Sequence, residues 1–316
     1  MGIRVLKGGM MTTVQDLGRT GYQSQGFSVS GVMDVRSFKI ANLLLDNPEN
    51  EAVLEFTLIG PTLEFTSETI IAITGGDFRP QINGKPAKMY TAIYMHRGDI
   101  LTFGGARTGT RGYIAFSSYL DVPVVMGSRS TNIKCQIGGF KGRKLEDEDY
   151  IAFRAKRRYL PYYLSRSLDL DEFDQEKITL RVVMGPQEKM FTKEGRETFL
   201  NSEYTVTSEF DRMGCRLEGP FIAYKTTSDI ISDGIAFGSV QVPSHGKPII
   251  LLADRQTTGG YAKIATVVSV DIPKLVQRKT EQKVRFQAVS VEEAQKLLAD
   301  EMKELIDFRS QIYTPC

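Results

Sequence analysis

Residues 248–264 have the sequence PIILLADRQTTGGYAKI, in which an apolar run is followed by a polar stretch and then by a second apolar stretch that begins at Ile264. The first run, Pro248–Ala253, is short and wholly apolar, which is typical of a buried β-strand. The octapeptide that follows, Asp254–Tyr261, combines an acid, a base, a carboxamide, two hydroxyls, two glycines and a phenol. A short strand followed by polar, glycine-containing residues and another apolar stretch predicts β-structure in this part of the chain.

The same pattern recurs along the sequence and decides the predicted fold class. Only two stretches, 36–46 and 291–308, place apolar residues at helical spacing. We therefore predict a mainly β protein, built from β-barrels with a few peripheral helices. The predicted strands are short, apolar or β-branched, and mostly bounded by Gly, Pro, Asn or Asp: Ile3–Leu6, Ala52–Thr57, Thr69–Thr74, Ile100–Phe103, Tyr113–Phe116, Ile178–Val183, Ile249–Ala253 and Val284–Phe286.

Composition limits the possible partners and compartments. The chain has 316 residues, enough for two hydrophobic cores, since single domains usually have about 100–200 residues. Its 40 basic and 38 acidic residues give a formal net charge of +2, which predicts neither a nucleic-acid nor a membrane partner. The N-terminus resembles no signal peptide, and no apolar stretch approaches the roughly 20 residues that cross a bilayer. We therefore expect a soluble, cytoplasmic protein. Three widely spaced cysteines predict no metal site and no disulfide framework.

A charged stretch divides the chain near its middle. A cluster of basic residues after residue 153 is followed by the acidic run Asp169–Glu176, a composition typical of a solvated connector. Four pairs of short motifs occur in the same order on both sides, among them Asn83–Pro86 with His245–Pro248 and Arg111–Tyr113 with Gly259–Tyr261. A decayed duplication of one β-domain explains this order, and the alternative is coincidence among common turn sequences. We predict a first β-domain at residues 1–155, a connector at 156–177, and a second β-domain with the C-terminal helix at 178–316.

Three polar clusters are candidate sites. In the octapeptide Asp254–Tyr261, glycines permit close approach of a ligand, and the polar groups follow a buried strand; the alternative is a tight polar hairpin. A second cluster, Thr12–Tyr22, contains a carboxamide, a carboxylate, a guanidinium and a phenol. Its alternative explanation, a local Asp16–Arg19 ion pair, would contribute only about 0–1 kcal/mol if exposed. The third, Gly127–Asn132, is hydroxyl-rich around one arginine and is either an anion-binding loop or an ordinary turn.

Two further motifs are interpreted as structural. Asp34 precedes a predicted helix and is expected to be its N-cap, with a ligand role as the alternative. The segment Asp211–Gly214 pairs opposite charges before a glycine and is expected to have a structural role.

Familiar nucleotide and hydrolase motifs are absent from the sequence. Both Gly-Lys-Pro tripeptides, at 84–86 and 246–248, carry proline where a P-loop requires serine or threonine. We therefore expect that this chain does not bind ATP in a familiar way. The chain has only two histidines, so acid–base chemistry would depend on Asp, Lys or Tyr.

Several motifs occur in order along nearly the whole chain and together identify a family resemblance. They are Thr13–Arg19 with Gly21 and Tyr22, Ser30–Asp34, Arg111–Tyr113, Gly127–Thr131, Asp211–Gly214, Gln241–Pro243 and Asp254–Tyr261. The sequence resembles the allophanate hydrolase subunit 2 family, also called the biotin-dependent carboxyltransferase-like family. This resemblance implies two cyclophilin-like β-barrel domains, without implying prolyl isomerase activity.

Within that family, the chain most resembles the type that forms the C subunit of bacterial ATP-dependent 5-oxoprolinase. The resemblance implies a complex that opens the lactam of 5-oxoproline to glutamate with hydrolysis of ATP. It also implies two partners, a B subunit, which is cyclophilin-like, and an A subunit, without which this chain is expected to be inactive. One alternative is a carboxyltransferase that moves carboxylate from carboxybiotin, held by a separate carrier, to urea or another amide. Another is a non-catalytic antagonist of a histidine-kinase inhibitor.

The oxoprolinase interpretation assigns roles to the polar clusters. We expect the amide group of the substrate to contact Asp254, Gln256 and Tyr261, which are the predicted catalytic residues. We expect Arg19 or Arg129 to hold the carboxylate of the substrate. We expect the two clusters Gln15–Tyr22 and Asp254–Tyr261 to face a common cleft whose chemistry is completed by another subunit. The predicted substrate-binding residues are Gln15, Asp16, Arg19, Tyr22, Arg129, Gln241, Thr257, Thr258, Gly259 and Gly260.

Overall fold

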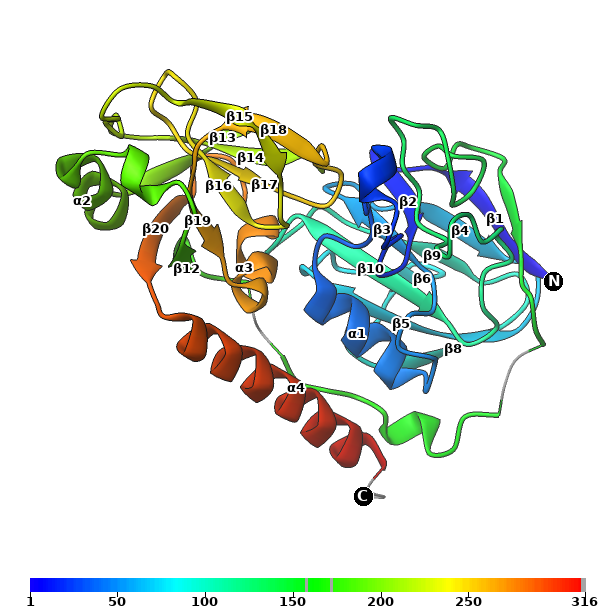
Figure 1. Cartoon of the computed structure of the whole chain (residues 1–316). Helices are drawn as coiled ribbons and strands as arrows, with labels where there is room; N and C mark the ends of the chain where they lie inside the picture. Colours follow the sequence, from blue (N-terminus) through cyan, green and yellow to red (C-terminus); the bar gives the residue numbers. More distant parts are fainter. Residues whose placement is uncertain (157–158, 171–172, 314–316) are drawn as a thin grey trace. The chain divides into compact units, whose positions relative to one another are not determined.

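A computed structural model describes residues 1–156, 159–170 and 173–313 (Figure 1). The chain forms two compact units. Unit 1 comprises Met1–Thr20, Ser30–Asp174 and the chain from Lys303 onward, and unit 2 comprises Gly21–Val29 and Gln175–Met302. Both units are built mostly of antiparallel strands with few helices, so the predicted mainly β fold class with peripheral helices is confirmed, and unit 2 contains a closed barrel.

Unit 1 contains two antiparallel sheets. The first consists of β1 (Gly2–Lys7), β4 (Thr62–Phe65), β6 (Gln81–Ile82), β7 (Lys85–Pro86), β9 (Ile100–Thr102) and β11 (Tyr150–Ala152), in the order β11-β1-β4-β9-β6-β7. The second consists of β2 (Met11–Gln15), β3 (Val53–Thr57), β5 (Thr69–Gly75), β8 (Ala92–Met95) and β10 (Arg111–Phe116), in the order β2-β3-β10-β5-β8.

The second sheet is buried on both of its faces, which explains why every residue of β5 and β10 is buried. Alternate side chains of a strand point to opposite faces. Ile71 and Ile114 pack into a core shared with strands of the first sheet, whereas Ile70 and Tyr113 belong to the core that includes α1 (Val35–Leu44). Helix α1 lies against β5 and β10 of the second sheet (Figure 1).

Helix α1 begins where the sequence predicts. The Asp34 carboxylate accepts hydrogen bonds from Ser37 N at 2.9 Å and Ser37 Oγ at 2.7 Å. The predicted N-cap role of Asp34 is therefore confirmed.

Unit 2 is a closed barrel with a small additional sheet. The barrel strands are β12 (Lys177–Met184), β13 (Tyr204–Phe210), β14 (Gly214–Glu218), β16 (Ser239–Gln241), β17 (Ile249–Leu251), β19 (Lys263–Val267) and β20 (Lys283–Ala288), in the order β12-β19-β16-β17-β14-β13-β20. Parallel pairing of β12 with β20 closes the barrel. A separate two-stranded sheet joins β15 (Asp229–Gly234) to β18 (Thr258–Tyr261).

Each of the eight predicted strands and both predicted helices overlaps an observed element, including the last helix, α4 (Val291–Tyr313). Two helices were not anticipated, α2 (Lys193–Asn201) and α3 (Ile272–Val276). The proposed duplication is not evident at the motif pair 111–113 and 259–261. The first lies in β10, at the centre of a five-stranded sheet, and the second in β18, whose one partner among the described strands is β15.

The compact units differ from the predicted domain boundaries in two respects. Most of the predicted connector belongs to unit 1, because Arg166 is buried and donates to Pro161 O at 2.9 Å and to Leu44 O at 3.3 Å. Residues 157–158 and 171–172 of that connector lie outside the described part. The end of α4 also belongs to unit 1, where Phe308 and Ile312 join the core beneath α1.

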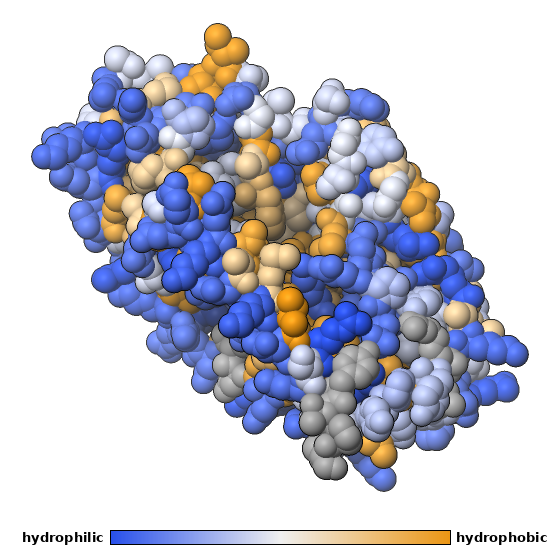
Figure 2. Space-filling view, turned by 60° about the horizontal axis from the view of Figure 1, so that its bottom comes forward, coloured by the Kyte–Doolittle hydropathy of each residue, from blue (hydrophilic) through white to orange (hydrophobic). Residues whose placement is uncertain are grey.

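The surface shown in Figure 2 is predominantly hydrophilic, with apolar residues scattered among charged and polar ones. Scattered exposed apolar side chains of this kind are common on the surfaces of folded proteins. Within the described residues, no helix is both long and apolar enough to traverse a lipid bilayer.

Candidate functional site

The predicted polar clusters at Gln15 and Arg129 meet in unit 1. Thr131 donates from both its backbone N and its Oγ1 to Val14 O, each at 2.9 Å. Gln15 Nε2 donates to Thr131 O at 3.2 Å. The loop at 127–132 therefore lies along the end of β2, although the two motifs are more than a hundred residues apart in the sequence.

Asp16 is the centre of this arrangement. Its side chain is buried, and Oδ1 accepts hydrogen bonds from Ser128 Oγ and Ser130 Oγ, both at 2.6 Å, and from Gly18 N at 2.8 Å. Oδ2 accepts from Arg129 N at 2.6 Å. A buried carboxylate requires such donors, and here the protein itself supplies them. The geometry favours a role for Asp16 in holding the loop at 127–132, and its predicted contact with substrate stays a prediction.

Burial also limits what the neighbouring residues can reach. Arg19 is only 1% exposed, and its Nη2 donates to Ser130 O. Gln15 is fully buried and also donates to Thr13 Oγ1 at 3.0 Å. Arg129 is only partly buried, with Nε donating to Val122 O at 3.3 Å. Of the two arginines predicted to hold a carboxylate, Arg129 is therefore the more accessible.

Tyr22 is separated from that cluster because it belongs to unit 2. Its carbonyl accepts from Gln25 N at 3.0 Å and Phe27 N at 3.3 Å, in a short turn. The same segment is attached to the octapeptide, since Ser28 Oγ donates to Arg255 O at 2.7 Å. The predicted cluster Gln15–Tyr22 is thus divided between the two units.

The octapeptide Asp254–Tyr261 is not a tight hairpin. Strands β17 and β19 each pair with β16 rather than with each other. The second half of the octapeptide forms β18, which pairs with β15. The polar residues therefore bridge the barrel and the small sheet of unit 2.

Asp254 is held by Arg212, which lies in a different motif of the sequence. Its carboxylate accepts from Arg212 Nε at 2.8 Å and from Arg212 Nη2 at 3.2 Å. Both side chains are largely buried, with 11% and 10% exposed. A second bond, from Asp254 N to Arg212 O at 2.8 Å, joins the same two segments. The segment 211–214 therefore has a structural role, as predicted, and it also orients a predicted catalytic carboxylate.

Arg255 is another residue whose importance the sequence did not reveal. Its guanidinium is buried and donates to Ile235 O at 3.0 Å and Leu252 O at 3.1 Å, and it lies over the Phe237 ring. Burial lowers the pKa of Arg255 to about 10. These bonds anchor the start of the octapeptide to the loop that follows β15.

A pocket of about 540 Å³ lies on the outer face of the barrel in unit 2. Cys215, Val240 and Ile250 point into the barrel core, so their strand neighbours form the floor of this pocket. Its lining residues are Ser208–Asp211, Met213, Gly214, Arg216, Gln241, Ile249, Leu251, Gln256 and Tyr261. The structure thus brings together three of the predicted site residues, Gln241, Gln256 and Tyr261.

Gly259 allows the two carboxamides to approach this strand. A Cβ at position 259 would lie 2.7 Å from Ile235 Cδ1 and 2.9 Å from Gln241 Nε2. It would also lie 3.7 Å from Gln256 Nε2. At Gly260 the nearest atom, Ile230 O, is 3.5 Å away, which is an ordinary contact.

We therefore expect Gly259→Ala to lower the free energy of unfolding by about 1–3 kcal/mol because it overpacks Ile235 and displaces Gln241. Gly260→Ala is the matched control and should change stability by less than about 0.5 kcal/mol. Urea unfolding followed by circular dichroism measures both. Equal stability of the two variants would contradict the close packing at Gly259.

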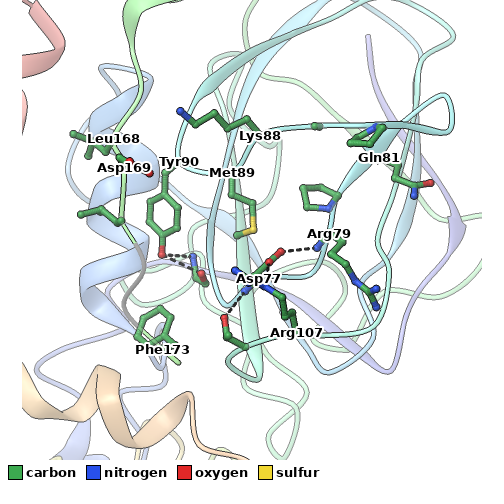
Figure 3. A pocket seen from close by; sticks show the side chains of 16 residues that line it. Asp77, Arg79, Gln81, Lys88, Met89, Tyr90, Arg107, Leu168, Asp169 and Phe173 are labelled. Atoms are coloured by element: carbon green, nitrogen blue, oxygen red, sulfur yellow. Dashed lines mark hydrogen bonds and ion pairs between the residues drawn. The ribbon is translucent and has the colours of Figure 1, made fainter. Parts of the chain in front are cut away.

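A second pocket, of about 580 Å³, lies in unit 1 and is lined by none of the predicted site residues (Figure 3). Its polar groups are largely bonded within the protein. Asp77 accepts from Arg107 Nε at 2.7 Å and from Arg79 N at 2.9 Å, and the Tyr90 hydroxyl bonds to the backbone of Gly75. Across the described residues, no three His, Cys, Asp or Glu side chains are grouped as metal ligands.

Comparison with known proteins identifies the family. Residues 25–288 match the family model described as carboxyltransferase domain, subdomain A and B. The chain belongs to this family. The match includes the pocket of unit 2, the octapeptide and Arg129, whereas Gln15, Asp16, Arg19 and Tyr22 precede it.

Individual members of this carboxyltransferase family cover nearly the whole chain. It is 34% identical to the C subunit of 5-oxoprolinase from Escherichia coli (strain K12), over 95% of this chain and 96% of that protein. It is 31% identical to urea amidolyase of Lachancea kluyveri, over 92% of this chain but 17% of that longer protein. The crystal structure of the K. lactis urea amidolyase matches with a TM-score of 0.89 and 29% identity, over 97% of this chain and 20% of that one. The resemblance inferred from the motifs is confirmed.

Proposed function

We propose that this chain is one subunit of an ATP-dependent 5-oxoprolinase, which converts 5-oxoproline to glutamate. The observation that supports this most directly is the similarity to the C subunit of the Escherichia coli 5-oxoprolinase, which extends over 95% of this chain and 96% of the relative. The urea amidolyase of Lachancea kluyveri, in contrast, is matched over 17% of its length.

The pocket of unit 2 has the chemistry that a small amide requires. The carboxamides of Gln241 and Gln256 and the phenol of Tyr261 can each donate and accept hydrogen bonds. A lactam presents one N–H donor and one carbonyl acceptor, so these groups can address both. Asp254 does not line the pocket; under this proposal, its bond to Arg212 positions the octapeptide from which Gln256 and Tyr261 project.

ATP does not fit this pocket well. Arg216 is the one cationic residue among the residues that line it, whereas a triphosphate is usually held by several cations or by a glycine-rich loop at a helix N-terminus. We therefore propose that a partner binds ATP, that the A and B subunits complete the enzyme, and that this chain is inactive alone.

The proposal is tested by reconstitution. The A and B subunits co-expressed with this chain should release glutamate from 5-oxoproline only when ATP is present, and this chain alone should release none. Release by the isolated chain would contradict the need for partners. A well-folded complex of the three proteins without any ATP-dependent release would contradict the proposed function.

Within that complex, Gln256→Ala is expected to lower kcat/KM by about five- to tenfold, the effect of losing one hydrogen bond of about 1–1.4 kcal/mol. Gln287→Ala is the matched control, because Gln287 is exposed on β20 and is absent from the pocket. Steady-state kinetics measures both variants. If Gln256→Ala has the same activity as the control, the Gln256 side chain does not bind the substrate, and this side of the pocket has only a structural role.

A second candidate function is carboxyl transfer from carboxybiotin to urea or another amide. The family model and the TM-score of 0.89 to a urea amidolyase favour it. That reaction needs a separate biotin carrier and bicarbonate. Carboxylation of an amide that depends on carrier and bicarbonate, without glutamate release from 5-oxoproline, would support this second function over the first.

A further inference from the structure

One cation lies on the floor of the pocket of unit 2. Arg216 stands on β14 between the buried residues Cys215 and Leu217, so its side chain points to the outer face of the barrel. It is opposite Ile249 on β17, which is in turn opposite Gln241 on β16. Since neighbouring strands are about 4.8 Å apart, the Cα atoms of Arg216 and Gln241 are separated by about 10 Å. A small molecule between their side chains can contact both.

A β-bulge places a carboxylate beside this arginine. Val206 of β13 is opposite Leu217 and Phe210 is opposite Cys215, so residues 207–209 all lie opposite Arg216. Bulges re-aim the side chains of the bulged strand. The Thr207 hydroxyl stabilises the bulge at residues 207–209, because Oγ1 donates to Arg216 O at 3.0 Å and accepts from Glu209 N at 3.2 Å.

The resulting ion pair occupies only part of the guanidinium. Arg216 Nε is 2.8 Å from Glu209 Oε2, and 47% and 71% of the two side chains are exposed. Among the described residues, the ion pair to Glu209 uses Nε of Arg216 and leaves both Nη groups available to bind a carboxylate. The other acid in the pocket, Asp211, has its Oδ1 engaged by Met213 N and Gly214 N.

We propose that Arg216 binds the carboxylate of the substrate through its Nη groups, and that Glu209 limits the affinity of this cation for anions. This inference rests on the proposed function, in which the substrate carries one carboxylate and one lactam amide. The row Arg216, Ile249 and Gln241 has a cation at one end and a carboxamide at the other, and these match the carboxylate and the amide of the substrate. Arg216 is therefore a specificity-determining residue that selects carboxylated lactams over neutral ones.

Kinetics of the reconstituted complex tests the assignment. Arg216→Met should raise the KM for 5-oxoproline at least tenfold and change kcat less than threefold. Glu209→Gln should lower the KM about two- to threefold, and should have no effect when combined with Arg216→Met. The matched control is Arg285→Met on β20, which removes a half-exposed arginine paired with Glu203 at 3.4 Å away from the pocket and should leave the KM unchanged.

A neutral analogue provides a readout that a merely structural role of Arg216 would not produce. Inhibition by 2-pyrrolidinone, the lactam without a carboxylate, should be equally strong in the wild type and in Arg216→Met. An unchanged KM in Arg216→Met, or a raised KM in Glu209→Gln, would overturn the inference. A parallel loss of 2-pyrrolidinone inhibition in Arg216→Met would also overturn it, because that loss indicates a damaged pocket.

Calorimetric titration of the complex with 5-oxoproline separates this inference from the proposed function. Binding that depends on Arg216, in a complex that releases no glutamate, would support the inference and contradict the proposed function. Glutamate release and 5-oxoproline binding that are both insensitive to Arg216→Met would support the function and overturn the inference.

Discussion

Replacing Asp16 by alanine is expected to lower the free energy of unfolding by about 3–4 kcal/mol. The substitution removes the acceptor for the hydroxyls of Ser128 and Ser130 and for the backbone N of Gly18 and Arg129. Each buried donor left without a partner costs about 1–3 kcal/mol, and partial rearrangement of the loop at 127–132 recovers some of this. The structure should be weakened mainly where the loop at 127–132 lies along β2.

Circular dichroism in urea measures the stability of this variant, since the chain contains no tryptophan. Amide hydrogen exchange should show faster exchange at residues 127–132 in particular. The matched control, Asp121→Ala, removes an exposed aspartate of the same unit and should change stability by less than about 0.5 kcal/mol. A loss below about 1 kcal/mol in Asp16→Ala would show that this carboxylate does not organise the loop, and would favour its predicted contact with substrate instead.

Asp271→Asn is expected to destabilise unit 2 by about 2–3 kcal/mol at pH 7. Asp271 is fully buried and accepts from Arg181 Nε at 2.8 Å and Nη2 at 2.6 Å, and it pairs with Lys274 Nζ at 2.8 Å. It therefore attaches α3 to β12. The asparagine keeps the shape of this contact but leaves two cations without their carboxylate.

The loss of stability in Asp271→Asn should become smaller as the pH falls. Burial alone would raise the pKa of Asp271, but hydrogen bonds from Arg181 and Lys274 outweigh it and hold the pKa below its usual range. The stabilisation is thus fully present above the unfolded-state pKa, about 4, and is lost as the pH falls through the lower folded-state pKa. The stability difference between wild type and Asp271→Asn should be constant above about pH 5 and shrink below pH 4.

Urea unfolding at a series of pH values measures this difference. Asp300→Asn, on the exposed side of α4 in the same unit, is the control and should match the wild type throughout. A difference that grew as the pH fell would contradict the direction of the pKa shift.

Much of the fold follows from patterns that span only a few residues. The apolar runs at Thr69–Thr74 and Tyr113–Phe116 predict strands because burial on both faces of a sheet produces nearly continuous apolar sequence. The α1 boundary could be predicted because the cap bond joins Asp34 to Ser37, three residues on. The short helix α3 was missed because its five residues are too few to show helical periodicity.

The candidate site was only partly predictable. The motifs predict Gln241, Gln256 and Tyr261 as site residues, and these three line one pocket. The motifs do not indicate a role in the site for Arg212, Arg216 or Glu209. Nothing in the local sequence around Arg212 indicates that its partner is Asp254, 42 residues later. Glu209 reaches Arg216 only because β13 has a bulge opposite that residue.

Neighbouring residues alone indicate the class of fold, eight of its strands, the start of α1 and the family, because strand patterns, caps and motifs are local features of the sequence. Tertiary structure alone decided which polar groups meet. Asp16 and Ser128, 112 residues apart, are joined because the loop at 127–132 lies along β2. The row Arg216, Ile249 and Gln241 exists because β14, β17 and β16 are adjacent in that register. Strand order and register depend on packing throughout the unit, and local sequence does not contain them.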